Sequence, residues 1–235
     1  MTKQLFAKLK VFHDSTAHPA AMNMAVDEAL LESATIPIIR FYRWRSPSLS
    51  FGYFGKFSDV AVYAAERESV RRWTGGGIVL HGDDLTYSIV IPAADAAFNE
   101  SSIVIYEKIH RALADALNEI GEHAVVAWGI EAGSIAVSKH ATVSASGYNC
   151  FEKPVHADVM MAGRKIAGAA QRRTRRGLLQ QGSIQGLSVD THLAGKFAHA
   201  LATDCTGSEI DEQIFGRARE LTQQKYGTDS WLRMR

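Results

Sequence analysis

Between Arg71 and His81 the chain reads Arg-Arg-Trp-Thr-Gly-Gly-Gly-Ile-Val-Leu-His. Its three adjacent glycines let the backbone come close to a ligand, because no Cβ atom stands in the way, and their N–H groups can converge on a carbonyl or phosphate oxygen. The stretch is not a P-loop, since no Gly-Lys-Ser/Thr follows, and it is not a dinucleotide fingerprint, since Leu80 stands where a glycine is needed. A tight turn between strands would account for the glycines alone. The arginines before them and the histidine after them favour a binding site.

A lysine among small residues marks a second candidate site. From Gly163 to Gln171 the chain reads Gly-Arg-Lys-Ile-Ala-Gly-Ala-Ala-Gln. Lys165 can project into a cleft that bulkier neighbours would close. The alternative is a solvated lysine on a strand, which is the better interpretation of any lysine taken singly.

The two cysteines differ in their surroundings. They are too few for a disulfide framework, and the nine histidines lack metal-ligand spacing, so no metal site is expected. Cys150 lies between Gly147 and Pro154, which predicts a loop. A free thiol titrates near ~8.5, and a neighbouring cation lowers that pKa. Lys165 is a candidate for this cation if the two segments meet. Cys205 has no such setting, and we interpret it as a small buried hydrophobe.

A local basic patch stands out on a chain of formal net charge +1. A solvated hairpin tip is the plain explanation for it. The functional alternative is a docking site for an acidic partner, held by electrostatic steering and charge-assisted hydrogen bonds. The patch consists of Arg172, Arg173, Arg175 and Arg176.

Composition places the chain among ordinary globular proteins. Of its 235 residues 46% are apolar and 22% charged, which excludes disorder and fibrous repeats. The near-neutral charge provides no basic field for nucleic acid. No apolar run approaches the ~18 residues that a membrane span needs, and the lysine-rich N-terminus lacks a signal-peptide core. We therefore expect a cytoplasmic monomer that binds neither nucleic acid nor membrane, with residues 1–235 forming one domain.

Hydrophobic periodicity predicts an α+β fold, because strands and helices do not alternate strictly along the chain. Turn chemistry is expected over 48–55. Strands are expected over 38–44, 85–91 and 123–128, and as a hairpin over 166–170 and 178–184.

Three helices are expected. One over 105–120 ends at Gly121. Asn23 is expected to cap an earlier helix that carries Asp27 and Glu28 in its first turn. A last helix is expected to open with a capping box of Ser208 and Asp211.

Together these stretches resemble the lipoate–protein ligase and octanoyltransferase superfamily, whose catalytic fold is shared with biotin–protein ligases. The resemblance implies a class II aminoacyl-tRNA synthetase/biotin–lipoate ligase-like fold, in which mixed β-sheets pack with helices. The matching motifs are Arg-Arg-x-Thr-Gly-Gly-Gly-x-Val-x-His at Arg71 to His81, Asp-Leu-x-Tyr-Ser at Asp84 to Ser88, Asn-Met-Ala-x-Asp-Glu-Ala-Leu at Asn23 to Leu30, and Gly-x-Lys-Ile-x-Gly-x-Ala-Gln at Gly163 to Gln171.

Two features bear on the choice between ligase and transferase. The family's ligases usually need a C-terminal accessory domain, fused or separate, whereas only about one helix is expected after Ser183, so we expect no such domain. Cys-Phe-x-x-Pro, at Cys150 to Pro154, looks like the cysteine loop of the octanoyltransferases typical of Gram-positive bacteria. Those enzymes use the cysteine as an acyl carrier.

The resemblance therefore implies octanoyl transfer from acyl carrier protein to a lysine of a lipoyl domain, in a glycine-cleavage H protein or the E2 component of a 2-oxoacid dehydrogenase. Cys150 would carry the acyl group and Lys165 would hold its carbonyl, with no cofactor. Val79, Leu80, Tyr87 and Ile166 are candidate walls of an apolar slot for the acyl chain. The residues expected to bind substrate are Arg72, Thr74, Gly75, Gly76, Gly77, His81, Tyr87, Gly168 and Ala169.

Two alternatives stay open. An ATP-dependent lipoate–protein ligase, or its catalytic subunit, would need ATP and magnesium and would make Cys150 incidental. A non-catalytic lipoyl-domain binder would keep the cleft without the chemistry. Two positions depart from the family pattern and bear on recognition of the acyl donor: Gln181 stands where the family commonly has histidine, and Ala169 where it commonly has serine.

Overall fold

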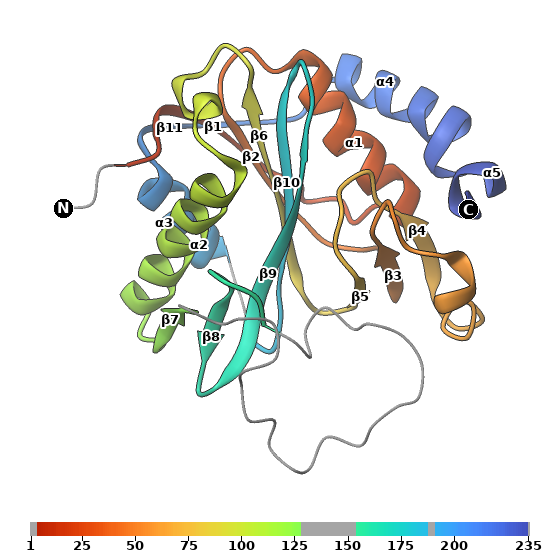
Figure 1. Ribbon diagram of the computed structural model, residues 1–235. Helices are drawn as coiled ribbons and strands as arrows, with labels where there is room; N and C mark the ends of the chain where they lie inside the picture. Colours follow the sequence, from red (N-terminus) through yellow and green to blue (C-terminus); the bar gives the residue numbers. More distant parts are fainter. Residues whose placement is uncertain (1–3, 128–153, 188–190, 235) are drawn as a thin grey trace.

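Two β-sheets form the frame of the molecule (Figure 1). The computed structural model describes residues 4–127, 154–187 and 191–234. The strands of these ranges are β1 (Phe6–His13), β2 (Ile38–Tyr42), β3 (Ser48–Phe51), β4 (Glu68–Arg71), β5 (Ile78–His81), β6 (Leu85–Pro92), β7 (Ala124–Val126), β8 (Val159–Met161), β9 (Arg164–Arg173), β10 (Gly177–Ile184) and β11 (Ala202–Ser208). The larger sheet has the order β11-β1-β2-β6-β10-β9-β8-β7, and the smaller has the order β4-β3-β5.

Helices cover both faces of the larger sheet (Figure 1). α2 (Ser102–Glu119) and α3 (Thr191–Leu201) pack on one face, where Ile109 and Phe197 join strand residues in one core. α1 (Ala20–Ser33) and α4 (Glu212–Leu221) pack on the other, beside the smaller sheet. The remaining short elements are η1 (Phe57–Asp59), η2 (Ala96–Asn99), η3 (Thr222–Tyr226) and α5 (Asp229–Leu232). The predicted α+β class is confirmed, and no helix in the described ranges is both long and apolar enough to cross a membrane.

The predicted hairpin and the predicted strand before it form the middle of the larger sheet. β9 pairs antiparallel with β10, and β10 pairs antiparallel with β6. Every residue of β6 and β10 is buried, because layers cover both faces of the sheet there. The alternation of apolar and polar residues along β6 therefore separates two interior faces. One is the apolar core under α2 and α3, and the other is a polar interior beneath α1, where Ser88 donates a hydrogen bond to Asp27.

The prediction for the helix over 105–120 is confirmed by α2. The Ser101 side chain accepts a hydrogen bond from the N–H of Val104 at its start. Gly121 follows its end with φ +93°, a left-handed conformation that glycine adopts without strain. The expected strand over 123–128 is observed as β7, and Trp128 lies outside the described residues.

The predicted start of the first helix is wrong. α1 begins at Ala20, so Asn23, Asp27 and Glu28 lie inside it and are buried. The N-cap residue, Pro19, makes no side-chain hydrogen bond, and the Glu68 carboxylate of β4 accepts from the N–H of Ala20 instead. The polar residues that resembled a cap are hydrogen-bonded across the core.

The expected turn over 48–55 is correct only in its second half. Ser48–Phe51 forms β3, which pairs parallel with β4 and antiparallel with β5. Leu49 and Phe51 are buried in a small core of their own with Val60 and Ile78. The serines and the glycines that follow favour a turn, but burial of Leu49 and Phe51 makes this segment a strand.

The segment after Ser183 holds more than the one helix expected. It forms α3, β11, α4, η3 and α5, and β11 pairs parallel with β1 at the edge of the larger sheet. Ser208 ends β11 and is not the cap of α4, because Asp211 alone accepts from the N–H of Ile214 there. These elements pack on the same layers as the rest of the chain.

We expect Gly182→Ala to destabilise the fold. An added Cβ would lie 2.3 Å from Cζ of Tyr87. That ring is held in place, because Tyr87 is buried against Phe197 and its hydroxyl contacts His110. Overpacking of this kind costs about 1–3 kcal/mol, which urea unfolding followed by circular dichroism measures.

Gly195→Ala is the matched control, because nothing lies within 4 Å of the added methyl group. Gly195 lies inside α3, where alanine is favoured over glycine by about 1 kcal/mol. This variant should be as stable as the wild type or more so. Equal stability of the two variants would contradict the close packing of Gly182 on Tyr87.

Candidate active site

A pocket lies between the larger sheet, α1 and the smaller sheet. It holds about 480 Å³ of empty space, its mouth included. The predicted site residues that line it are Arg72, Gly76, His81, Lys165, Gly168 and Ala169. The residues that line it without having been predicted include Met24, Tyr42, Trp44, Ser50, Thr86 and Gln181.

The glycine stretch forms a loop that another backbone segment approaches closely. An added Cβ at Gly52 would lie 2.1 Å from the carbonyl oxygen of Gly76, so only glycine fits at the end of β3. Gly76 itself has φ +83°. Arg72 donates from Nη2 to the carbonyl oxygens of Gly75 and Gly77, at 3.0 and 2.8 Å. The sharp shape of the loop is therefore held from inside by the arginine that precedes it.

Arg71 ties the same loop to the end of the chain. Its buried guanidinium group donates to the carbonyl oxygens of Tyr53 and Gly55 in the turn after β3. It also donates to the carbonyl oxygens of Trp231, Leu232 and Met234. The Trp231 indole returns a hydrogen bond to the carbonyl oxygen of Arg71. The first arginine of the motif thus acts as a clamp on backbone.

Gln181 links the loop to α1. The Thr74 hydroxyl donates to its Oε1 atom at 2.8 Å, and its Nε2 atom donates to Oδ2 of Asp27 at 2.7 Å. Asp27 also accepts hydrogen bonds from Arg40, Tyr42 and Ser88. Thr74 therefore supports the pocket without lining it. Sequence reasoning missed Arg40, although the Asn-Met-Ala-x-Asp-Glu motif already pointed to Asp27.

His81 is locked in one orientation. Its Nδ1 atom lies 2.8 Å from Oδ2 of Asp84, its Nε2 atom lies 2.7 Å from the Ser50 hydroxyl, and its ring stacks on Trp44 at 3.9 Å. Burial lowers the pKa of the imidazole, against the hydrogen bond to Asp84. Burial opposes ionisation of Asp84, but hydrogen bonds, the first from His81, lower the pKa of its carboxyl group. A neutral ring that donates to Asp84 fits these contacts, and they favour a role of His81 in ordering the pocket wall.

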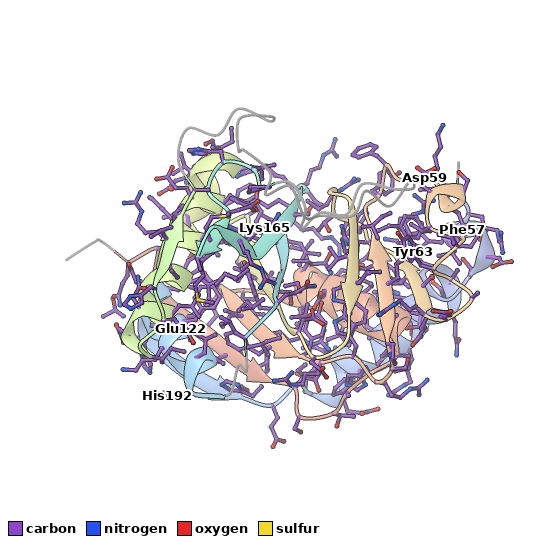
Figure 2. All side chains as sticks on the ribbon, turned by 90° about the horizontal axis from the view of Figure 1, so that it is seen from below. Phe57, Asp59, Tyr63, Glu122, Lys165 and His192 are labelled. Atoms are coloured by element: carbon purple, nitrogen blue, oxygen red, sulfur yellow. The ribbon has the colours of Figure 1, made fainter. Side chains whose placement is uncertain are left out.

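Lys165 lines the pocket. It lies at the start of β9 (Figure 2). Its side chain is only 6% exposed, and Nζ lies 2.8 Å from Oδ2 of the fully buried Asp158. Tyr106 of α2 donates to Oδ1 of the same carboxylate at 2.6 Å. An added Cβ at Gly168 would lie 2.4 Å from Cε of Lys165. The bare backbone of Gly168 therefore makes room for the ammonium group, as the small residues around the lysine indicated.

Tyr87 does not line the pocket, contrary to the prediction. It faces the core under α2 and α3 with Ile166, because residues at these positions point to that side of the sheet. Leu80 packs on the small core of β3. Of the expected walls of an apolar slot, Val79 lines the pocket. Cys150, the predicted nucleophile, lies outside the described residues.

The four arginines of the hairpin do not form one patch. Successive residues of a strand point to opposite faces, so Arg172 and Arg173 diverge. Arg172 lies over the rings of Tyr53 and Trp73, near the glycine loop. On the other face, Arg173 donates to the carbonyl oxygens of Phe98 and Glu100. Arg176 lies 3.7 Å from the carboxylate of Glu32, and Arg175 is exposed.

No metal site emerges from the described residues, in which no three His, Cys, Asp or Glu side chains gather in a way that would hold an ion.

We expect the protein to lose stability as the pH falls from 6.5 to about 4. His110 is fully buried, between the carbonyl oxygen of Ala157 and the Tyr87 hydroxyl. Burial lowers its pKa from 6.5 to about 4. In this window the unfolded chain binds a proton that the folded chain excludes, so acidification favours unfolding, by about 3 kcal/mol over the whole window.

Urea unfolding between pH 7 and pH 4 tests this expectation. His110→Gln removes the titrating group and should flatten the dependence of stability on pH. His199→Gln, at an exposed position, should keep it. A wild-type slope in His110→Gln would show that the dependence has another source.

Comparison with known proteins identifies the family. The lipoyl protein ligase A/B catalytic domain model matches residues 19–214. Octanoyltransferase LipM of Oceanobacillus iheyensis is 36% identical over 181 residues, which cover 74% of this chain and 62% of that protein. LipM of Geobacillus kaustophilus is 36% identical over 190 residues, covering 77% and 66%. The chain thus spans less than two thirds of the length of these two relatives. The match to LipM of Brevibacillus brevis, at 29% identity, covers 90% of this chain and 94% of that protein.

Solved structures agree on the fold. A putative lipoate protein ligase from Thermoplasma acidophilum with bound lipoic acid superposes with a TM-score of 0.73 at 22% identity, over 98% of this chain and 99% of that chain. A lipoate-protein ligase A bound with ATP superposes with a TM-score of 0.73 at 22% identity, over 97% of this chain and 98% of that chain. The family model covers most of the sequence, and the chain therefore belongs to the lipoyl protein ligase A/B catalytic domain family.

Proposed function

We propose that this protein is an octanoyltransferase. It moves an octanoyl group from acyl carrier protein, through a thioester on Cys150, to a lysine of a lipoyl domain. The observation that carries the proposal is the buried ammonium group of Lys165 on the wall of a largely apolar pocket beside the glycine loop. Relatives named octanoyltransferase LipM, at 36% identity over 74% of this chain, support the choice of reaction.

The pocket suits a medium-length acyl chain. Met24, Tyr42, Trp44 and Val79 supply apolar surface along its wall. Burial of the seven octanoyl carbons beyond the carbonyl contributes about 5–6 kcal/mol before the costs of binding, at about 0.8 kcal/mol per methylene. An acetyl group offers one such carbon, so the pocket favours the longer chain.

The reaction proceeds by two exchanges at one carbonyl carbon. The Cys150 thiolate attacks the octanoyl thioester, a new carbon–sulfur bond forms, and the thiolate of the carrier leaves. The neutral amine of the acceptor lysine then attacks the Cys150 thioester, an amide forms, the thiolate leaves, and the amine loses a proton to solvent. Lys165 donates a hydrogen bond to the carbonyl oxygen, where negative charge develops in both steps. Thioester to amide runs downhill, so ATP is not consumed.

Two arginines of the hairpin are the proposed contacts for acidic partners. Arg172 lies over Trp73, next to the glycine loop. Arg175 is exposed to solvent. Arg173 is committed to carbonyl oxygens of this chain and Arg176 lies near Glu32. Acyl carrier protein and a lipoyl domain, from an H protein or an E2 component, would use this contact in turn.

Mass spectrometry of the intact protein tests the proposal. The protein is incubated with octanoyl-acyl carrier protein without ATP, and a lipoyl domain is then added. We expect one octanoyl group on Cys150 that moves to the lipoyl domain. Lys165→Met should slow formation of the adduct about 100-fold or more, the usual effect of removing one oxyanion donor.

The second cysteine provides the control. Cys205 is half-buried, and burial raises the pKa of its thiol. Cys150→Ala should abolish the adduct, whereas Cys205→Ala should retain it. Modification of the lipoyl domain by Cys150→Ala only when ATP and magnesium are present would establish a ligase instead. Binding of the lipoyl domain with no modification under either condition would establish a binder.

A further inference from the structure

We propose that Asp158 is a positioning residue that keeps Lys165 as an ammonium ion, so that Lys165 holds the acyl carbonyl without becoming acylated itself. This inference rests on the proposed octanoyl transfer. The reaction delivers an acyl group to a lysine amine, and Lys165 is a lysine amine at the pocket that receives the acyl group. The site must therefore distinguish its own lysine from that of the acceptor.

Protonation is what separates the two amines. A neutral amine carries a lone pair that can attack the thioester carbonyl, forming a carbon–nitrogen bond as the carbon–sulfur bond breaks and a proton passes to solvent. The product would be an octanoyl amide on Lys165, which no later step removes. An ammonium ion has no lone pair and can only donate hydrogen bonds. Burial disfavours the charged form of a lysine, and the Lys165 side chain is 6% exposed.

Asp158 supplies the charge that offsets this burial. Its side chain is fully buried, and Oδ2 lies 2.8 Å from Nζ of Lys165. The N–H of Val155 donates to the same oxygen at 2.7 Å, and the Tyr106 hydroxyl donates to Oδ1 at 2.6 Å. Both carboxylate oxygens of Asp158 thus accept hydrogen bonds from this chain. A buried charge pair persists when its remaining lone pairs are hydrogen-bonded, and this condition is met here on both oxygens.

Tyr106 extends the arrangement to the pocket wall. Burial, with Asp158 beside it, raises the pKa of Tyr106 well above its ordinary value, so its hydroxyl keeps its proton and donates. The same hydroxyl oxygen accepts a hydrogen bond from the N–H of Ala169 at 3.1 Å, and Ala169 lines the pocket. Hydrogen bonds thus link Lys165, Asp158 and Tyr106 to the pocket-lining backbone of Ala169.

The other titratable groups near the pair do not replace Asp158. His110 of α2 is neutral at pH 7, because burial lowers its pKa to about 4. Burial raises the pKa of Tyr87 of β6, which stays a neutral phenol. Across the pocket, Arg72 is a second cation and His81 is held neutral by burial. The carboxylate in contact with Lys165 is therefore the group whose removal should free the amine.

Two measurements on Asp158→Asn test the proposal. The first uses no acyl donor: limited labelling with acetic anhydride at several pH values, with Lys165 quantified by peptide mass spectrometry. Loss of the carboxylate should increase labelling of Lys165 about tenfold or more at a fixed pH. The second is incubation with octanoyl-acyl carrier protein at pH 8. We expect octanoyl-Lys165 to accumulate in the variant and to be absent from the wild type.

Two further variants make every outcome informative. Tyr106→Phe removes one hydroxyl and should raise labelling of Lys165 severalfold, and it carries the test if Asp158→Asn does not fold. Asp95→Asn is the matched control, because Asp95 caps η2 outside the pocket, and it should label like the wild type. Unchanged labelling in a folded Asp158→Asn variant would overturn the proposal.

The outcomes separate this proposal from the transferase itself. Octanoylation of Cys150 without octanoyl-Lys165 in Asp158→Asn would overturn the protective role. Increased acetic anhydride labelling with no octanoyl group on any residue of the wild type would leave the charge-holding role of Asp158 supported and would overturn the proposed octanoyl transfer.

Discussion

The architecture around the pocket depends on the ion pairs and hydrogen bonds of the buried Arg40 guanidinium group. It donates to Asp27 and Asn23 of α1 and to Asp14 beyond the end of β1. A buried charged group is tolerated only when it is paired with an opposite charge and hydrogen-bonded. α1 must therefore lie where its acidic face meets this one strand residue. The charged and polar partners of Arg40 thus fix the position of α1 together with the apolar residues that it packs in the core.

That constraint reaches the glycine loop through two more side chains. Asp27 accepts from Gln181, and Gln181 accepts from Thr74. The position at which the family commonly has histidine is thus a neutral connector between a buried carboxylate and a hydroxyl. On the far side of the pocket, Asp158 and Lys165 form a second buried pair. The first pair lies beneath α1, and the second places Lys165 on the pocket wall.

The parts of the molecule that were predictable have local signals. α2 and the hairpin of β9 and β10 follow from periodicity, a cap and a turn. The start of α1 does not, because the side chain that caps it, Glu68, lies 48 residues further along the chain. Motifs located Lys165 in the pocket. Trp44 was not predicted, since an apolar residue that faces a cleft has the same spacing as one that faces a core. Tyr87 was assigned to the cleft because alternation along β6 does not distinguish two interior faces.

The clamp formed by Arg71 has a consequence for how the protein is made. Carbonyl oxygens of Trp231, Leu232 and Met234 are among the acceptors of its guanidinium group. A nascent chain emerges from the ribosome N-terminus first, so the arginine appears long before these acceptors do. β4 and β5, on either side of the glycine loop, can each pair with β3 early. The loop acquires the contacts with the C-terminal carbonyl oxygens only after residue 234 has left the ribosome.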